Sequence, residues 1–210
     1  MALDINTVLR ELKKLYPKAE CTLDFKNPLE LLVATILSAQ CTDKRVNVVT
    51  KKLFKKYKKP EDYISVPQKE LEGDICTCGT FRMKAKAIQT SCKIIIDQFK
   101  GKVPRTMEDM LKLRGVGRKT AAIVLGTSYG VIEGIPIDTH NIRLLRRLGL
   151  TRAKTQDKIE KAMMKRAPKK EWLNLSHLMV AHGRAICTAR NPKCGHCVFG
   201  EICPSSTVKH

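Results

Sequence analysis

The sequence contains no apolar run close to the roughly 18 residues that a membrane-spanning helix needs. No lipidation motif stands at either end, and the N-terminal stretch lacks the basic leader and apolar core of a secretory signal. Strand signals, repeats, low-complexity segments and long linkers are nearly absent, whereas helix start and stop signals recur. The sequence therefore predicts an all-α globular protein that stays in the cytoplasm or nucleoid.

Acidic residues are scarce relative to basic ones. The 210 residues include only 20 Asp and Glu against 40 Lys and Arg, which gives a formal net charge of +20. An imbalance of this size indicates a polyanionic partner. Nucleic acid fits better than an anionic membrane surface because nothing in the sequence anchors it to a bilayer. We expect a monomer that binds nucleic acid and no membrane.

Nine cysteines are an odd number, and in a reducing compartment they indicate thiols or metal ligands instead of a disulfide framework. Four of them, Cys187, Cys194, Cys197 and Cys203, are separated by six, two and five residues. Such thiolates can bind one tetrahedral metal ion or the four irons of a cubane cluster, and the spacing alone leaves zinc and iron-sulfur both open. The nearby His182 and His196 are interpreted as ordinary packing or polar residues, and the other cysteines as plain thiols.

Helix caps and apolar periodicity divide the chain into helices. Asn27, Pro28 and Glu30 form a start signal for a buried helix that ends near Gln40. An amphipathic N-terminal helix carries Ile5, Val8, Leu9, Leu12 and Leu15 on one side. Further helices are predicted over 42–59, 82–99 with Met83 among its apolar residues, 106–113, 118–125, 139–148, 155–166 and 172–186.

The stretch LRGVGRKTAAIVLG, residues 113–126, predicts a tight glycine turn between two helices. Gly115 and Gly117 permit unusual backbone angles and close approach, and the following helix N-terminus attracts an anion. This arrangement can hold a DNA phosphate without reading bases. A plain connection between two helices has the same pattern, so the turn alone does not decide between them.

Arg118 and Lys119 fall in the first turn of that helix, where the macrodipole disfavours cations. A partly desolvated amine in this position loses its proton more readily, which is how a lysine becomes a nucleophile. The alternative is that Lys119 only contacts a phosphate or solvent. Asp138 likewise has two interpretations: an N-cap of the next helix, or a carboxylate that stabilises positive charge on a reacting sugar.

Together, LRGVGRKTAAIVL, IDTH at 137–140, LLVATILSAQ, GTFRMKAKAI and the C-terminal cysteines resemble the endonuclease III family of helix-hairpin-helix DNA glycosylases over most of the chain. The resemblance implies a two-lobed all-α fold: residues 21–132 form the helical domain with the hairpin, and 1–20 plus 133–210 form the domain with a C-terminal iron-sulfur loop. It also implies a 4Fe-4S cluster on the four cysteines. The implied activity is that of a bifunctional glycosylase and abasic-site (AP) lyase, acting in base-excision repair on damaged, oxidised pyrimidines in double-stranded DNA.

The resemblance assigns roles residue by residue. Lys119 forms a Schiff base with the sugar C1′, Asp138 is the catalytic carboxylate, and Gln40 fills the gap left by the everted nucleotide. Implied DNA contacts are Gly115, Val116, Gly117, Arg118 and His140, together with Arg184, Arg190 and Lys193 around the cluster loop. Thr80 with Phe81 replaces a wedging leucine, Arg114 replaces a proline and Cys41 an alanine, and these departures leave the wedge and the lesion preference open.

Three rival functions use the same residues. A mismatch-specific thymine or uracil glycosylase would share the fold. A non-catalytic helix-hairpin-helix module would use Lys119 only as a phosphate contact. An electron-transfer protein would use the cluster alone, but the charge excess points to DNA. Borohydride trapping on abasic DNA separates the first two.

Overall fold

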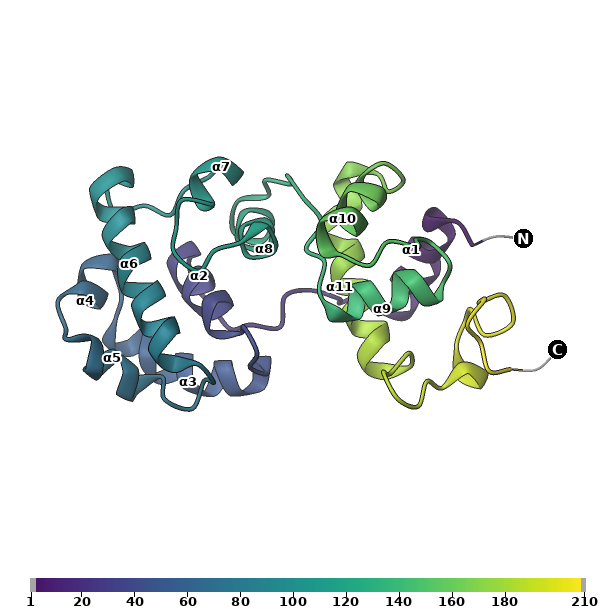
Figure 1. The fold of residues 1–210 in the computed structure, drawn as a ribbon, viewed down its shortest axis with the longest axis horizontal. Coiled ribbons are helices and arrows are strands. Elements are labelled where there is room, and N and C mark those ends of the chain that lie inside the picture. The colour runs from purple at the N-terminus through teal and green to yellow at the C-terminus, as the bar shows by residue number, and fades with distance from the viewer. Residues whose placement is uncertain (1–2, 209–210) are drawn as a thin grey trace. The chain divides into compact units, whose positions relative to one another are not determined.

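The computed structural model describes residues 3–208. Within that range every regular element is helical, as the sequence predicts, and no residue is in a strand. None of the helices described there is long and apolar enough to cross a membrane. Backbone contacts divide the chain into two compact units (Figure 1), which we call the hairpin unit, Thr22–Glu133, and the cysteine unit, Met1–Cys21 with Gly134–His210.

The hairpin unit is built around one buried helix, α2. Asn27 caps it by accepting a hydrogen bond from the Glu30 backbone N at 2.9 Å, and Pro28 occupies its first turn, as predicted. The helix ends at Leu37, earlier than expected, so that Gln40 lies in the following turn. The helices of this unit are α2 (Pro28–Leu37), α3 (Asp43–Lys56), α4 (Pro60–Ile64), α5 (Gln68–Asp74), α6 (Phe81–Phe99), α7 (Met107–Met110) and α8 (Arg118–Tyr129).

Two short helices of this unit, α4 and α5, were not predicted. Pro60 occupies the first turn of α4, and the Asp62 carboxylate accepts from the backbone N of Lys58 and Lys59. Both helices pack against α6. Met83, expected on the apolar face of α6, is 64% exposed, so its prediction as a core residue is wrong.

The cysteine unit joins the two ends of the chain around α11. It contains α1 (Ile5–Leu15), α9 (Thr139–Arg147), α10 (Gln156–Met164), the 3₁₀ turn η1 (Lys169–Glu171), α11 (Trp172–Ala185) and the 3₁₀ turn η2 (Cys194–His196). Helices α1 and α9 both pack on α11, and Lys13 pairs with Glu171 at 2.7 Å. Leu15 is 50% exposed, so the buried face of α1 ends one turn earlier than predicted.

Candidate functional site

The predicted glycine turn connects α7 to α8 in the hairpin unit. Gly115 has φ +76°, a backbone angle that favours glycine, and a Cβ there would lie 3.0 Å from the Ala87 Cβ. Gly117 has an ordinary φ of −97°, and a Cβ there would meet nothing within 4 Å. The expected need for unusual angles therefore holds for Gly115 and is wrong for Gly117, where nothing within the protein requires a glycine.

Val116 is the middle residue of the predicted glycine turn and one of the implied DNA contacts. Its side chain is buried, and its backbone N donates to the Leu113 carbonyl oxygen at 3.3 Å. The side chain therefore anchors the turn in the core, which presents the flanking glycines outward. An apolar residue between two glycines is the one in the turn that suits the core, and the implied DNA contact of Val116 stays a prediction that its backbone would have to make.

Helix α8 begins with Arg118 and Lys119, as predicted, and has no acidic residue in its first turn. The first backbone bond of the helix runs from Ala121 N to the Gly117 carbonyl oxygen, so the amides before Ala121 have no intrahelical acceptor. Lys119 is exposed. The hairpin unit therefore leaves this amine open to solvent, and its activation by desolvation stays a prediction.

Gln40 and Thr80 lie in two turns of the hairpin unit. The resemblance places them at the positions that fill the gap and wedge the DNA. Gln40 is exposed with φ +53°, and Thr80 is exposed with φ +55°. The turns adjoin, because a Cβ on Gly79 would lie 3.7 Å from the Gln40 carbonyl oxygen. Lys84, which the sequence reasoning missed, is buried beneath them, where its Nζ donates to the Leu37 carbonyl oxygen at 2.8 Å and burial lowers its pKa.

Asp138 is half-buried and caps α9. Its Oδ1 accepts from the backbone N and the side-chain Nδ2 of Asn141, each at 2.8 Å. The capping interpretation is therefore confirmed. Both of these hydrogen bonds go to Oδ1, so capping of α9 uses one oxygen of the carboxylate and does not need the other, Oδ2. Two residues later His140 packs closely against α11, where a Cβ on Gly183 would lie 2.6 Å from the His140 Nδ1.

The four cysteines of the C-terminal loop line one pocket, together with Arg147 and His182. Within residues 3–208 no three His, Cys, Asp or Glu side chains are gathered closely enough to hold a single metal ion. The four thiols nevertheless line one shared space. Four cysteines around one space fit a cubane cluster, because each thiolate binds its own iron.

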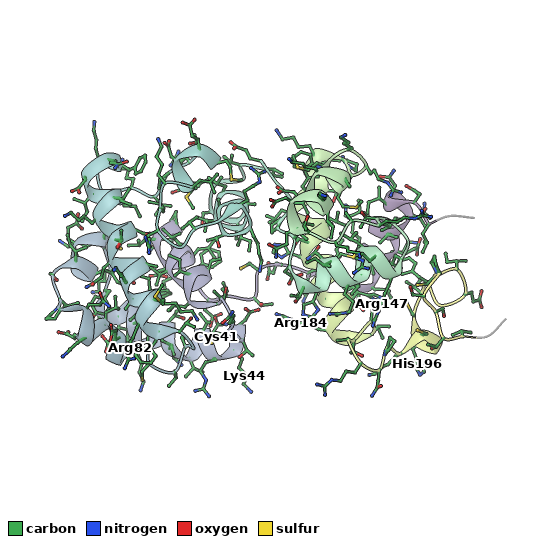
Figure 2. The ribbon with its side chains drawn as sticks, viewed as in Figure 1. Cys41, Lys44, Arg82, Arg147, Arg184 and His196 are labelled. Carbon is green, nitrogen blue, oxygen red and sulfur yellow. The ribbon has the colours of Figure 1, made fainter. Side chains whose placement is uncertain are left out.

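Arg147 fastens this loop to α9. Figure 2 labels Arg147. Its guanidinium donates to the carbonyl oxygens of Thr188 at 2.7 Å and Ala189 at 2.9 Å, and to the Cys187 Sγ at 3.4 Å. The Arg147 carbonyl oxygen accepts from the Cys203 Sγ at 3.3 Å. One arginine therefore contacts two of the four proposed ligands, a position that the sequence alone did not reveal.

His182 has a more specific position than its interpretation as an ordinary packing residue. It is buried between Tyr16 Oη, 3.0 Å from its Nδ1, and Cys197 Sγ, 3.4 Å from its Nε2. Burial lowers the pKa of His182 to about 4, so the imidazole is neutral at pH 7. Burial raises the pKa of the Cys197 and Cys203 thiols, whereas hydrogen bonds with Thr207 lower that of Cys194.

Basic side chains are exposed on several parts of the cysteine unit. The three predicted around the cluster loop, Arg184, Arg190 and Lys193, are all exposed, and Arg184 lies near the end of α11 (Figure 2). The sequence reasoning missed a separate cavity of about 600 Å³, whose lining includes Arg143, Arg146, Arg147 and Arg152. Such a concentration of arginine favours phosphate groups.

The two units divide the candidate residues. The hairpin unit carries Gln40, Gly115, Val116, Gly117, Arg118 and Lys119, and the cysteine unit carries Asp138, His140, Arg184, Arg190, Lys193 and the four cysteines. In the hairpin unit the first turn of α8 brings cations and amides to one exposed end. In the cysteine unit α9 connects Asp138 at its N-terminus with Arg147, which touches the cysteine loop.

Comparison with known proteins matches both regions. Residues 33–169 match the model of the HhH-GPD superfamily base excision DNA repair protein, and residues 187–203 match that of the iron-sulfur binding domain of endonuclease III. An endonuclease III of Synechocystis sp. is 49% identical over 199 residues, covering 95% of this chain and 91% of that relative. Two solved structures, a non-covalent endonuclease III–DNA complex and a trapped endonuclease III–DNA covalent intermediate, each match with a TM-score of 0.92 and 46% identity. Each match covers 96% of this chain and 94% of the solved chain.

Proposed function

The chain belongs to the endonuclease III family of base-excision DNA repair enzymes, and from this we propose which of its residues act on the damaged strand. It is a DNA glycosylase and AP lyase whose partner is double-stranded DNA and whose cofactor is a 4Fe-4S cluster. Its proposed substrates are oxidised pyrimidines, and its proposed site of action is the cytoplasm, on the nucleoid. The observation that carries the residue assignment is Lys119, exposed in the first turn of α8 beside the glycine turn.

In the proposed reaction the Lys119 Nζ attacks C1′ of an everted nucleotide, and the bond from C1′ to the base breaks. Positive charge develops on the sugar as the base leaves, and the Asp138 carboxylate stabilises it. The sugar ring then opens to a Schiff base, whose positive charge acidifies the C2′ proton. Loss of that proton expels the 3′ phosphate and cuts the strand. Bound DNA supplies the desolvation that α8 does not give to Lys119.

The remaining candidates are proposed to hold the DNA in place. The outward face of the turn at Gly115 and Gly117 and the amides of the first turn of α8 grip a backbone phosphate. Arg118, His140, Arg184, Arg190 and Lys193 contact the backbone, and Gln40 fills the gap left when the nucleotide swings out. For Val116 the proposed contact is made by the backbone, because its side chain is buried.

The cluster is proposed to have a structural role. Cys187, Cys194, Cys197 and Cys203 would hold it, and when bound it cross-links the loop that carries Arg190 and Lys193. The thiols release their protons to solvent when their sulfurs bind iron, so binding of the cluster and ordering of the loop are coupled. Arg147 and His182 orient three of the four ligands from outside.

A panel of duplexes, each with one altered base, tests the substrate assignment. We expect thymine glycol and hydroxylated cytosine to be excised faster than a mismatched thymine or uracil under single-turnover conditions. Faster excision of the mismatched bases would favour the alternative mismatch-specific glycosylase, which shares the same fold.

Gly117→Ala tests the glycine turn as a DNA contact. A Cβ there meets nothing in the protein and the backbone angle is ordinary, so the melting temperature should change by no more than about 2 °C. A methyl group on the outward face should hold the phosphate away and weaken DNA binding about tenfold. The matched variant Gly115→Ala should instead lose stability, because its φ of +76° disfavours alanine. Unchanged DNA affinity in Gly117→Ala would leave the turn a plain connector.

Gly200→Ala tests the packing of the cluster loop. The Gly200 backbone N donates to the Cys197 carbonyl oxygen at 2.8 Å, and a Cβ on Gly200 would overlap the carbonyl oxygen of Cys194. The loop would have to open, so we expect the anaerobically purified variant to hold less than half the iron of the wild type. Iron analysis and visible absorbance measure this. Gly195→Ala is the matched control, since a Cβ there meets nothing within 4 Å. Stoichiometric zinc without iron in the wild type would contradict the cluster assignment.

A further inference from the structure

A closed ring of hydrogen bonds holds Asp138. As described above, Asn141 donates twice to the Asp138 Oδ1. The same Asn141 Nδ2 lies 3.2 Å from the Ser176 Oγ on α11, and Ser176 Oγ donates to the Pro136 carbonyl oxygen at 2.6 Å. Because Pro136 stands two residues before Asp138, the ring returns to the segment from which it started.

Asn141 lowers the stability of the fold in this position through one of its polar atoms, Oδ1. A carboxylate only accepts hydrogen bonds, so the amide must point its Nδ2 toward Asp138 and its Oδ1 elsewhere. That Asn141 Oδ1 is buried without a hydrogen-bond partner, in a residue with no exposed surface. An unsatisfied buried acceptor costs stability that an apolar side chain of the same size would not. The hydrogen bonds of Nδ2 have to offset this cost before an asparagine stabilises the fold here.

We infer that Asn141, held by Ser176, is a positioning residue that fixes the Asp138 carboxylate for base excision. This inference rests on the proposed role of Asp138. The backbone N of Asn141 alone would cap α9, but one hydrogen bond lets the carboxylate rotate about it. The second donor, Nδ2, fixes Oδ1 from another direction and leaves Oδ2 as the oxygen that faces the reacting sugar. Rates of catalysed steps depend strongly on such orientation.

Asn141→Leu separates a positioning role from a role in stability, because excision activity is expected to fall while the melting temperature stays the same or rises. The variant removes the Nδ2 donor and the unsatisfied oxygen but keeps the backbone cap. We expect single-turnover excision of thymine glycol to fall about tenfold. The affinity for a duplex with a tetrahydrofuran abasic analogue should stay within about twofold, and the melting temperature should be unchanged or higher.

Two further variants complete the test. Ser176→Ala frees Asn141 without touching Asp138, and it should slow excision in the same direction by a smaller factor. Asn174→Leu makes the same chemical change on α11, where Asn174 bonds only Glu171 among the described side chains, and it should excise at the wild-type rate.

Full excision activity in both Asn141→Leu and Ser176→Ala would overturn the inference. A lower melting temperature that accompanies the loss of activity in both variants would also overturn it, since the ring would then serve only the packing of the fold. Failure of the proposed catalytic role of Asp138 can be told apart from failure of the positioning role, because it would appear in Asp138→Asn. If that variant excises normally, Asp138 is not catalytic. If it is inactive while the ring variants are fully active, only the positioning role fails.

Discussion

Lys119→Ala is expected to form no covalent adduct when it is mixed with abasic DNA and borohydride, whereas the wild type forms one. Borohydride reduces the Schiff base to a stable amine, so the adduct reports the nucleophile directly. Strand cleavage should fall at least about a thousandfold because no neighbouring group replaces a covalent step. Lys119 is exposed and has no acidic residue beside it in the first turn, so the fold should not change.

Lys119→Arg separates chemistry from phosphate binding. Arginine keeps the positive charge and binds phosphate well, but it remains protonated and cannot attack C1′. We expect wild-type DNA affinity and no adduct. Lys51→Ala, an exposed lysine on α3, is the control and should be trapped normally. An adduct that persists in both variants at position 119 would show that another amine is the nucleophile, and the proposed reaction would be wrong.

Asp138→Asn is expected to slow base excision about a hundredfold to a thousandfold, the effect of removing one preorganised electrostatic group. The substitution suits the structure, since asparagine caps helices about as well as aspartate and its carbonyl oxygen can still accept from Asn141. DNA affinity should therefore stay within about threefold, and the melting temperature within about 2 °C. Single-turnover excision, binding to an abasic analogue and thermal unfolding measure the three quantities.

Asp138→Ala is the companion variant. It loses the carboxylate and the cap together, so it should lose stability by about 1 kcal/mol in addition to activity. Equal losses of excision and affinity in Asp138→Asn would mean that Asp138 serves only to start α9, and the capping interpretation would then be the whole explanation.

Local signals explain what the sequence predicted well. Asn27 with Pro28, Thr106 with Asp109 and Asp138 with Asn141 each start a helix through a bond between near neighbours. The cysteine spacing is local for the same reason, as all four thiols lie within 17 residues. Helices α4 and α5 escaped prediction because elements of five and seven residues are too short to show apolar periodicity.

Distant contacts explain what the sequence could not show. Asn141 meets Ser176 across 35 residues and Arg147 meets Thr188 across 41, so neither partner can be predicted from spacing. His182 reaches Cys197 only because α11 packs beneath the cysteine loop. Val116 illustrates a different limit, since a residue in a turn can face inward or outward and only packing decides.

The division of the chain into units also has a consequence for its synthesis on the ribosome. The hairpin unit is continuous, so it can fold as soon as Glu133 has left the exit tunnel. The cysteine unit has to wait, because α1 packs against α11 and Tyr16 meets His182 across 166 residues. Helix α1 is therefore translated before the other described helices, but it packs against α11 only after that helix has been made. Iron delivery must follow the emergence of Cys203, which makes it a late event in the maturation of the nascent chain.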